Sequence, residues 1–302
     1  YEGEQPLFLK ISFARPHSPY DPPQRILEMY ENIEIPAPAE GEWSKHIGKD
    51  ITDPKADSSA AFAQFSTEYV KNTRKHYYAA VTFIDEQVGR IVKALKEKGM
   101  YDNTIICFTS DHGDMMGDHH SWRKTYAYEG SAAIPMIIKT PKDVEGVHCR
   151  GKVIENPVEL RDILPTFLDA AGGETPEAMD GRSMLKLIKE ENPQWRRWID
   201  MEHATCYSEE NYWCALTDGK IKYIWFLRTG EEQLFDLVKD PHETVNQITN
   251  RKYRKQTDEL RRAMAEHLSE RGDKWVKDGQ LQKREKTLLY SPNYPSGLST
   301  KK

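Results

Sequence analysis

The stretch Thr104–Lys124, TIICFTSDHGDMMGDHHSWRK, decides the fold that this sequence predicts. It opens with the apolar run Ile105–Phe108, which has the length of one strand buried on both faces. The run breaks at Thr109-Ser110 into the polar cluster Asp111–Asp114, which contains a glycine that permits a tight turn. Proteins of the α/β class bind ligands beyond the carboxyl ends of such strands. The stretch therefore predicts an α/β fold and a site at its first loop.

The flanking sequence alternates predicted helices and strands. Residues 67–98 form a helix whose apolar side chains recur every three or four positions, and Gly99 is suited to end it. Residues 6–13 and 134–139 are predicted strands, and residues 158–171 are a further helix. Strands separated by helices favour a mostly parallel sheet flanked by helices.

The character of the chain changes after about residue 194. Three short predicted strands, 211–216, 222–227 and 233–237, are separated by turn-forming residues. A charged amphipathic helix follows at 253–271. We therefore expect two parts: residues 1–194 in the α/β domain, and residues 195–302 in a small antiparallel subdomain with a terminal helix and tail.

The composition excludes several classes of function. The 302 residues carry a net charge of −5, so we expect neither a nucleic-acid partner nor an anionic membrane surface. No apolar run approaches the roughly 20 residues that span a bilayer. The four cysteines form no CxxC pair, and the sequence leaves open whether Cys206 and Cys214 form a disulfide.

The candidate chemical groups gather in two places. Asp111 and His112 could hold a divalent cation, since oxygen ligands favour Ca²⁺ or Mg²⁺ and an imidazole admits Mn²⁺ or Zn²⁺. Lys124 and His17, the latter in a proline-rich loop, are a cation and a proton donor of the kind that surrounds an anionic substrate oxygen. Each could instead be a solvated surface residue, and His119 could be a metal ligand, a substrate contact or a polar loop residue. The residues alone thus reach metal-assisted chemistry on an anionic ester.

Six segments in a fixed order resemble the sulfatases of the alkaline-phosphatase-like superfamily. They are Pro16–Tyr20 (PHSPY), Thr109–Asp114 (TSDHGD), Gly117–Lys124 (GDHHSWRK), Tyr128–Pro135 (YEGSAAIP), Arg161–Thr166 (RDILPT) and Gln233–Glu243 (QLFDLVKDPHE). Each segment alone is a weak signal, but their shared order across the chain is a strong one.

This resemblance implies a role for each candidate. It makes Asp111 and His112 two ligands of one divalent cation, usually Ca²⁺, with Mn²⁺ or Mg²⁺ as alternatives. It places Lys124 on a sulfate oxygen and His17 near the leaving oxygen. His119 and Arg123 are then the expected substrate contacts, and a small anionic sulfate ester, aryl or carbohydrate, is the expected substrate. The family also implies a periplasmic or secreted location.

One part of the family pattern is not found in this sequence. The nucleophile of these enzymes is a formylglycine made in a C/S-x-P-x-R motif, and no cysteine or serine here lies in one. The Asp-Asp pair that completes the metal site is also not found. We expect both in a segment before Tyr1, so that the missing amino-terminal half is the main partner of this chain. Two alternatives remain open: a phosphonate monoester or phosphodiester hydrolase of the same superfamily, and a non-catalytic fragment.

Overall fold

The computed structural model describes residues 5–55, 57, 59–204 and 206–285, which form two compact units. The first unit is Tyr1–Pro38 with Phe65–Asn103, and the second is Ala39–Gln64 with Thr104–Lys302. The predicted boundary between residues 194 and 195 falls inside the second unit. That boundary stays a prediction about the domains of the protein.

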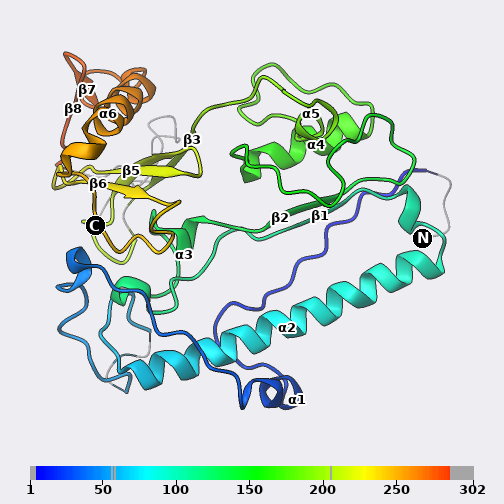
Figure 1. Cartoon of the computed structure of the whole chain (residues 1–302), viewed down its shortest axis with the longest axis horizontal. Helices are drawn as coiled ribbons and strands as arrows, with labels where there is room; N and C mark the ends of the chain where they lie inside the picture. The colour runs from blue at the N-terminus through cyan, green and yellow to red at the C-terminus, as the bar shows by residue number, and fades with distance from the viewer. Residues whose placement is uncertain (1–4, 56, 58, 205, 286–302) are drawn as a thin grey trace, which may run out of the picture. The chain divides into compact units, whose positions relative to one another are not determined.

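The first unit is built on the long helix α2, Thr67–Glu97, which confirms the predicted helix (Figure 1). Ser66 begins the helix, because its side chain accepts a hydrogen bond from the amide of Tyr69 at 3.2 Å. The short helices α1, Gln24–Leu27, and η1, Glu28–Tyr30, lie against α2, and Ile26 is fully buried there. The turn η3, Tyr101–Asn103, ends the unit.

The predicted strand at residues 6–13 is wrong for the described part of the chain. These residues form no strand, and apolar side chains such as Phe8 and Leu9 are 72% and 64% exposed. A strand exists only where its backbone groups pair with a neighbour, and no described segment pairs with this one.

The two strands around the central stretch pair in the antiparallel sense. β1, Ile106–Thr109, lies beside β2, Met136–Lys139, with Cys107 opposite Ile138. No parallel pair occurs among the described residues, so the sheet predicted to be mostly parallel appears here only as this antiparallel pair. Helix α4, Ile163–Ala170, lies within the predicted helix at 158–171, with η5, Leu160–Asp162, before it, and the short helix α5, Leu185–Lys189, follows.

A four-stranded antiparallel meander occupies the carboxyl-terminal part of the second unit. Its strands are β3, Ile199–His203; β4, Trp213–Thr217; β5, Ile221–Phe226; and β6, Glu232–Asp236, in that spatial order. The sequence analysis predicted the last three and missed β3. Helix α6, Arg254–Ser269, follows the turn η6, Arg251–Tyr253, and the hairpin of β7, Val276–Lys277, and β8, Gln280–Leu281, comes after it.

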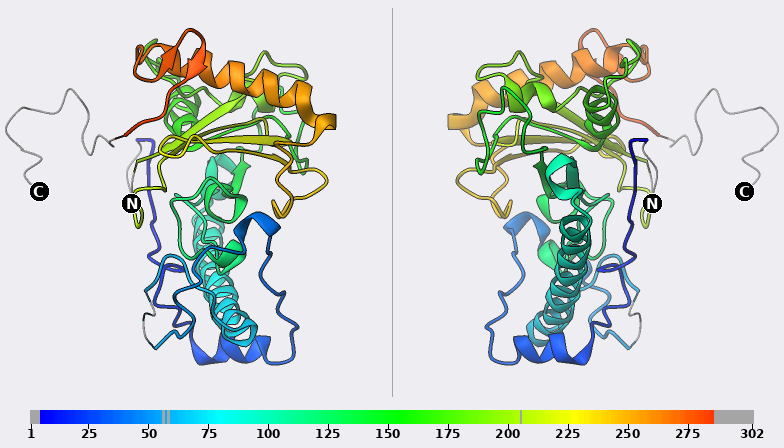
Figure 2. Two further views of the ribbon diagram at one scale, coloured as in Figure 1. Left: turned by 90° about the vertical axis from the view of Figure 1, so that its left-hand side faces the viewer. Right: turned by 90° about the vertical axis from the view of Figure 1, so that its right-hand side faces the viewer.

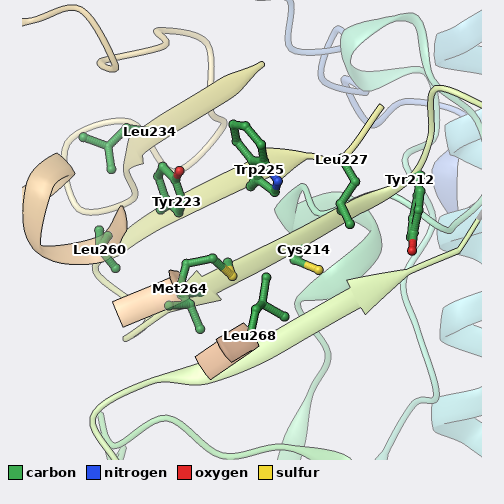
Figure 3. Close-up of a cluster of buried hydrophobic side chains, with 10 residues drawn as sticks. Tyr212, Cys214, Tyr223, Trp225, Leu227, Leu234, Leu260, Met264 and Leu268 are labelled. Atoms are coloured by element: carbon green, nitrogen blue, oxygen red, sulfur yellow. The ribbon is translucent and has the colours of Figure 1, made fainter. Parts of the chain in front are cut away.

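Both faces of this meander are buried. Helix α6 lies over one face of the sheet (Figure 2), and Cys214, Tyr223 and Leu234 point to this face, where they meet Leu260, Met264 and Leu268 of α6 (Figure 3). The alternate residues Trp213, Ala215, Ile224 and Phe235 point to the other face and pack against the segment Met115–Tyr128. Because successive side chains of a strand alternate between faces, one sheet supports α6 on one side and the central stretch on the other.

All four cysteines, including Cys206 and Cys214, are free thiols. Burial raises the pKa of the Cys214 thiol to about 12, so this side chain packs as a small apolar group. In the described part of the chain, no helix has the length and apolar content that crossing a bilayer requires.

Candidate active site

The site begins where β1 ends. After Thr109 the chain turns sharply, and the hydroxyl of Ser110 donates a hydrogen bond to the carbonyl of His112 at 2.7 Å. The amide of Gly113 donates to the carbonyl of Ser131, in α3 (Glu129–Ala132), at 2.8 Å. Both bonds hold the peptide unit between His112 and Gly113, and the amide of His112 donates to Oδ1 of Asp111 at 3.0 Å.

His112 and Asp111 direct their acceptor atoms toward each other. The His112 Nδ1 lies 2.7 Å from the carbonyl oxygen of Gly113, which only accepts, so Nδ1 carries the proton. In the neutral form of the ring, Nε2 is then the nitrogen with a free lone pair; it lies 3.7 Å from Oδ2 of Asp111, whose side chain is 84% exposed. A backbone carbonyl that fixes the tautomer of a histidine in this way is typical of histidines that bind metal ions.

These two side chains fit one divalent cation as part of its ligand set. A carboxylate oxygen and an imidazole nitrogen converge on one point from adjacent residues. Among the residues that the structure describes, no group of three or more His, Cys, Asp or Glu side chains is arranged to hold a metal ion. Asp111 and His112 would thus supply two ligands of such a site.

A tightly held loop follows, from Asp114 to Thr125. The Oδ1 of Asp114 accepts from the amides of Met116 at 3.0 Å and Arg123 at 2.9 Å, and the amide of Met115 donates to the carbonyl of Arg123 at 2.7 Å. Asp114 therefore joins the two ends of the loop. Within it, five residues other than glycine adopt a positive φ: Met116, His119, His120, Arg123 and Thr125. Such clusters of uncommon backbone conformations are concentrated at functional sites.

The remaining predicted site residues are distributed over the two units. Arg123 and the half-buried Lys124 close this loop in the second unit. His17 belongs to the first unit, where its Nδ1 lies 2.8 Å from the carbonyl oxygen of Ser18. The structure therefore brings Asp111 and His112 together, and the roles of Lys124, Arg123 and His17 stay predictions.

His119 differs from the other candidates because it is buried. Its side chain is 2% exposed, its Nε2 donates to the carbonyl of His242 at 2.9 Å, and its ring centroid lies 4.6 Å from that of Trp43. Burial lowers the pKa of this imidazole, although the carboxylates of Asp118 and Asp240 oppose that effect. These contacts anchor the loop to the core. The predicted substrate contact of His119 remains untested.

A buried ion network supports the segment that holds Gly113. Lys222 of β5 is fully buried, and its Nζ lies 2.7 Å from Oε1 of Glu129 and 2.8 Å from Oε1 of Glu243. The other oxygen of Glu243 accepts from the amide of Glu129 at 2.6 Å. The indole of Trp43 donates to the carbonyl of Glu243 at 2.8 Å, which ties the network to the aromatic cluster around His119.

Two glycines in close contact, Gly113 and Gly130, lie between this network and His112. Glu129 begins α3, and the next residue, Gly130, lies so close to Gly113 that a Cβ on Gly113 would be 2.2 Å from the Gly130 carbonyl oxygen. The sequence analysis noted Glu243 as part of a motif and missed Lys222. The available signal was a lysine in the middle of the apolar strand IKYIWF, where a charge requires a buried partner.

The comparisons with known proteins agree on one family. The sulfatase family model matches residues 1–173, and the model named N-sulphoglucosamine sulphohydrolase, C-terminal, matches residues 117–270. An arylsulfatase of Clostridium perfringens is 40% identical over 288 residues, which are 93% of this chain and 57% of that protein. A choline-sulfatase of Rhizobium meliloti is 33% identical over 259 residues, covering 82% of this chain and 48% of that protein.

A solved structure shows the same fold. The phosphonate monoester hydrolase of Agrobacterium radiobacter superposes with a TM-score of 0.70 at 26% identity, over 89% of this chain and 57% of that one. This likeness and others like it confirm the predicted alkaline-phosphatase-like fold. The chain spans about half the length of the curated relatives that it matches.

Proposed function

Because this chain belongs to the sulfatase family, we propose that the protein carrying it hydrolyses sulfate monoesters and that the chain supplies part of the active site. The observation that carries the proposal is the arrangement of Asp111 and His112. Nε2 of His112 and an exposed carboxylate oxygen of Asp111 lie 3.7 Å apart just after a strand, and two hydrogen bonds hold the peptide unit that follows His112.

The proposed roles follow the charge that develops during cleavage of a sulfate ester. Negative charge grows on the leaving oxygen, so a proton donor beside it lowers the barrier, and we assign this role to His17. The Lys124 ammonium binds a sulfate oxygen, and the Arg123 guanidinium and His119 contact the substrate around it. Asp111 and His112 hold the cation, most simply Ca²⁺, with Mn²⁺ or Mg²⁺ as alternatives.

Two groups that the family implies complete the proposal. A divalent cation bound at Asp111 and His112 would neutralise the sulfate oxygens and polarise the S–O bond. A formylglycine, made in a C/S-x-P-x-R segment that is not found in these 302 residues, would supply the nucleophile. We also propose that the protein acts in a periplasmic or secreted setting, as the family implies.

The test is sulfate release from 4-nitrophenyl sulfate by the longest natural form of the protein. Replacing His112 by Ala should lower kcat/KM by about a hundredfold or more and weaken Ca²⁺ binding, measured by titration calorimetry, at least tenfold. The matched control is His46→Ala, an exposed histidine of the same unit. Activity of the His112 variant within threefold of the parent, or no sulfate release from any aryl or carbohydrate sulfate, would refute the proposal.

A second candidate function is the hydrolysis of phosphonate monoesters or phosphodiesters. The likeness to two phosphonate monoester hydrolases, at TM-scores of 0.70 and 0.68, favours it. One preparation assayed with 4-nitrophenyl sulfate and 4-nitrophenyl phenylphosphonate decides between them through the ratio of the two kcat/KM values. Turnover of neither substrate by a preparation with a verified nucleophile would favour the non-catalytic alternative.

A further inference from the structure

A cationic hollow lies where α6 begins. It has a volume of about 730 Å³, and six of its eight lining residues carry a positive charge. The lining residues are Arg251, Lys252, Arg254, Lys255, Asp258, Arg261, Arg262 and Gln280. The net charge of the lining is positive although the chain as a whole carries −5, so this surface departs strongly from the rest of the molecule.

Four of the six cations form no ion pair with the described residues, although Lys255 and Arg262 help Arg197 to lower the pKa of the Glu259 carboxyl group. Arg261 forms a two-point pair with Glu232 at 2.6 and 2.9 Å, and Arg254 lies 3.9 Å from Asp258. Among the described residues, Arg251, Lys252 and Lys255 take part in no ion pair, and all three are exposed. Three cations are therefore available to a ligand at one place.

Cations at this position are expected to destabilise the helix α6 that carries them. The amino-terminal end of a helix has a partial positive charge and is normally stabilised by acidic or capping side chains. The first turn of α6 has no acidic residue, and the only side-chain cap that the described residues provide here is on the preceding turn η6, where Asn250 accepts from the amide of Lys252 at 3.1 Å. Bound anions would neutralise both the side chains and the helix end, so the unfavourable arrangement has an explanation if this surface binds anions.

We infer that this hollow binds an anionic polysaccharide, with several sulfate groups of one chain on its cations. The cations from position 251 to position 262 extend over roughly 16 Å of helix, more than one small anion can contact. The choice of sulfate as the anionic group rests on the proposed function, whereas binding of a polyanion does not.

The lining argues against two other polyanionic partners. Single-stranded nucleic acid is held by aromatic rings on which bases stack, and no aromatic residue lines the hollow. The nearby ring of Tyr253 is already covered by the Lys239 ammonium at 5.2 Å, and its hydroxyl donates to Asp236 at 2.6 Å. Stable attachment to an anionic membrane surface uses an apolar group in addition to cations, and no residue that lines the hollow is apolar.

The hollow lies apart from the Asp111–His112 segment within the second unit. The meander lies between α6 and the segment Met115–Tyr128, with one buried cluster on each face (Figure 2). Substitutions in the hollow should therefore alter polymer binding without changing the turnover of a small sulfate ester.

The experiment measures binding of fluorescein-labelled dextran sulfate by fluorescence anisotropy at two NaCl concentrations, with uncharged dextran as the blank. The test variant is Arg251→Gln/Lys252→Gln/Lys255→Gln. The control variant Lys98→Gln/Lys142→Gln/Lys152→Gln removes the same charge from exposed lysines elsewhere. We expect the test variant to bind at least tenfold more weakly, with a shallower dependence on salt, because fewer counterions are exchanged. The control should change less than twofold.

Three further readouts decide the outcome. The melting temperature of the test variant should be equal to or above that of the parent, because cations have been removed from a helix amino terminus. Equal weakening in both variants, or dextran sulfate binding that the test variant retains, would overturn the inference. Tighter binding of a single-stranded oligonucleotide or of anionic lipid vesicles at the same residues would overturn the choice of a polysaccharide. Binding by a protein that releases no sulfate would refute the proposed function and leave this inference standing.

Discussion

Replacing Lys222 by Met tests whether the carboxyl-terminal sheet holds the Asp111–His112 segment in place. Lys222 is fully buried between Glu129 and Glu243, at 2.7 and 2.8 Å. Methionine has nearly the same length and no charge, so the change removes the cation without a large loss of packing. Glu243, whose side chain is 2% exposed, is then left with a buried and unpaired charge, whereas Glu129, 36% exposed, can regain water.

The expected loss of unfolding free energy is about 3–5 kcal/mol, the usual cost of removing one partner from a buried ion pair. The double variant Lys222→Met/Glu243→Gln removes both buried charges and keeps an amide oxygen that can accept from the amide of Glu129. It should therefore lose about 1–3 kcal/mol less than the single variant, in the range of coupling between contacting residues. Urea denaturation followed by tryptophan fluorescence measures both differences.

Ca²⁺ binding separates an effect on the position of the Asp111–His112 segment from a general loss of folding stability. The matched control is Leu260→Ala on α6, which should cost about 2–5 kcal/mol on the opposite face of the same sheet. Calorimetric titration with Ca²⁺, well below all melting temperatures, should show Lys222→Met binding at least fivefold more weakly and Leu260→Ala unchanged within twofold. A stability loss below 1 kcal/mol for Lys222→Met, or equal Ca²⁺ affinities in the two variants, would contradict the reasoning.

Two further predictions concern the same segment. Burial lowers the pKa of His119 in the folded protein below its usual value of 6.5. As the pH falls, the unfolded chain therefore takes up a proton at this residue before the folded protein does. The free energy of unfolding should thus decrease as the pH drops from 6.5 toward the lowered pKa. Denaturation between pH 7.5 and 5 should show a smaller fall in His119→Gln than in the parent or in His46→Gln, and identical pH profiles would count against a buried neutral imidazole. Gly113→Ala places a Cβ 2.2 Å from the Gly130 carbonyl oxygen and should cost about 1–3 kcal/mol. Gly89→Ala in α2, where the added Cβ meets nothing within 4 Å, should instead gain about 0.5–1 kcal/mol, and thermal melts that rank the two alike would sink this explanation.

The elements with strong local patterns were predictable from the sequence. The apolar stripe of residues 67–98 gives α2 its extent, and the alternating residues of β4, β5 and β6 are separated by tight turns. β3 was missed because its sequence, IDMEH, carries two acids. Each acid is paired with a distant arginine: Asp200 with Arg161 and Glu202 with Arg271, both at 2.6 Å. A strand stabilised by partners so far along the chain has no local signal of its own.

The candidate site shows the same division. Asp111 and His112 are neighbours in sequence, so a turn after β1 was enough to predict that they share a site. The burial of His119 depends on Trp43, which lies 76 positions earlier, and the role of Lys222 depends on Glu243. Composition and spacing carry no information about contacts of this kind, because a histidine or lysine shows the same letter whether it is solvated or buried.

The two buried faces of the meander explain why the chemistry of the central stretch depends on residues far along the chain. Trp213, Ile224 and Phe235 form the surface on which Met115, Tyr126 and Tyr128 pack, so that face is part of the core beneath the Asp114–Thr125 loop. The loop has five residues in uncommon backbone conformations, which persist only where surrounding contacts over-determine them. The sheet and the Lys222 network supply those contacts. The Asp111–His112 segment and the antiparallel sheet therefore share one packed structure, and we expect a change on β5 to reach His112 through Glu129, Gly130 and Gly113.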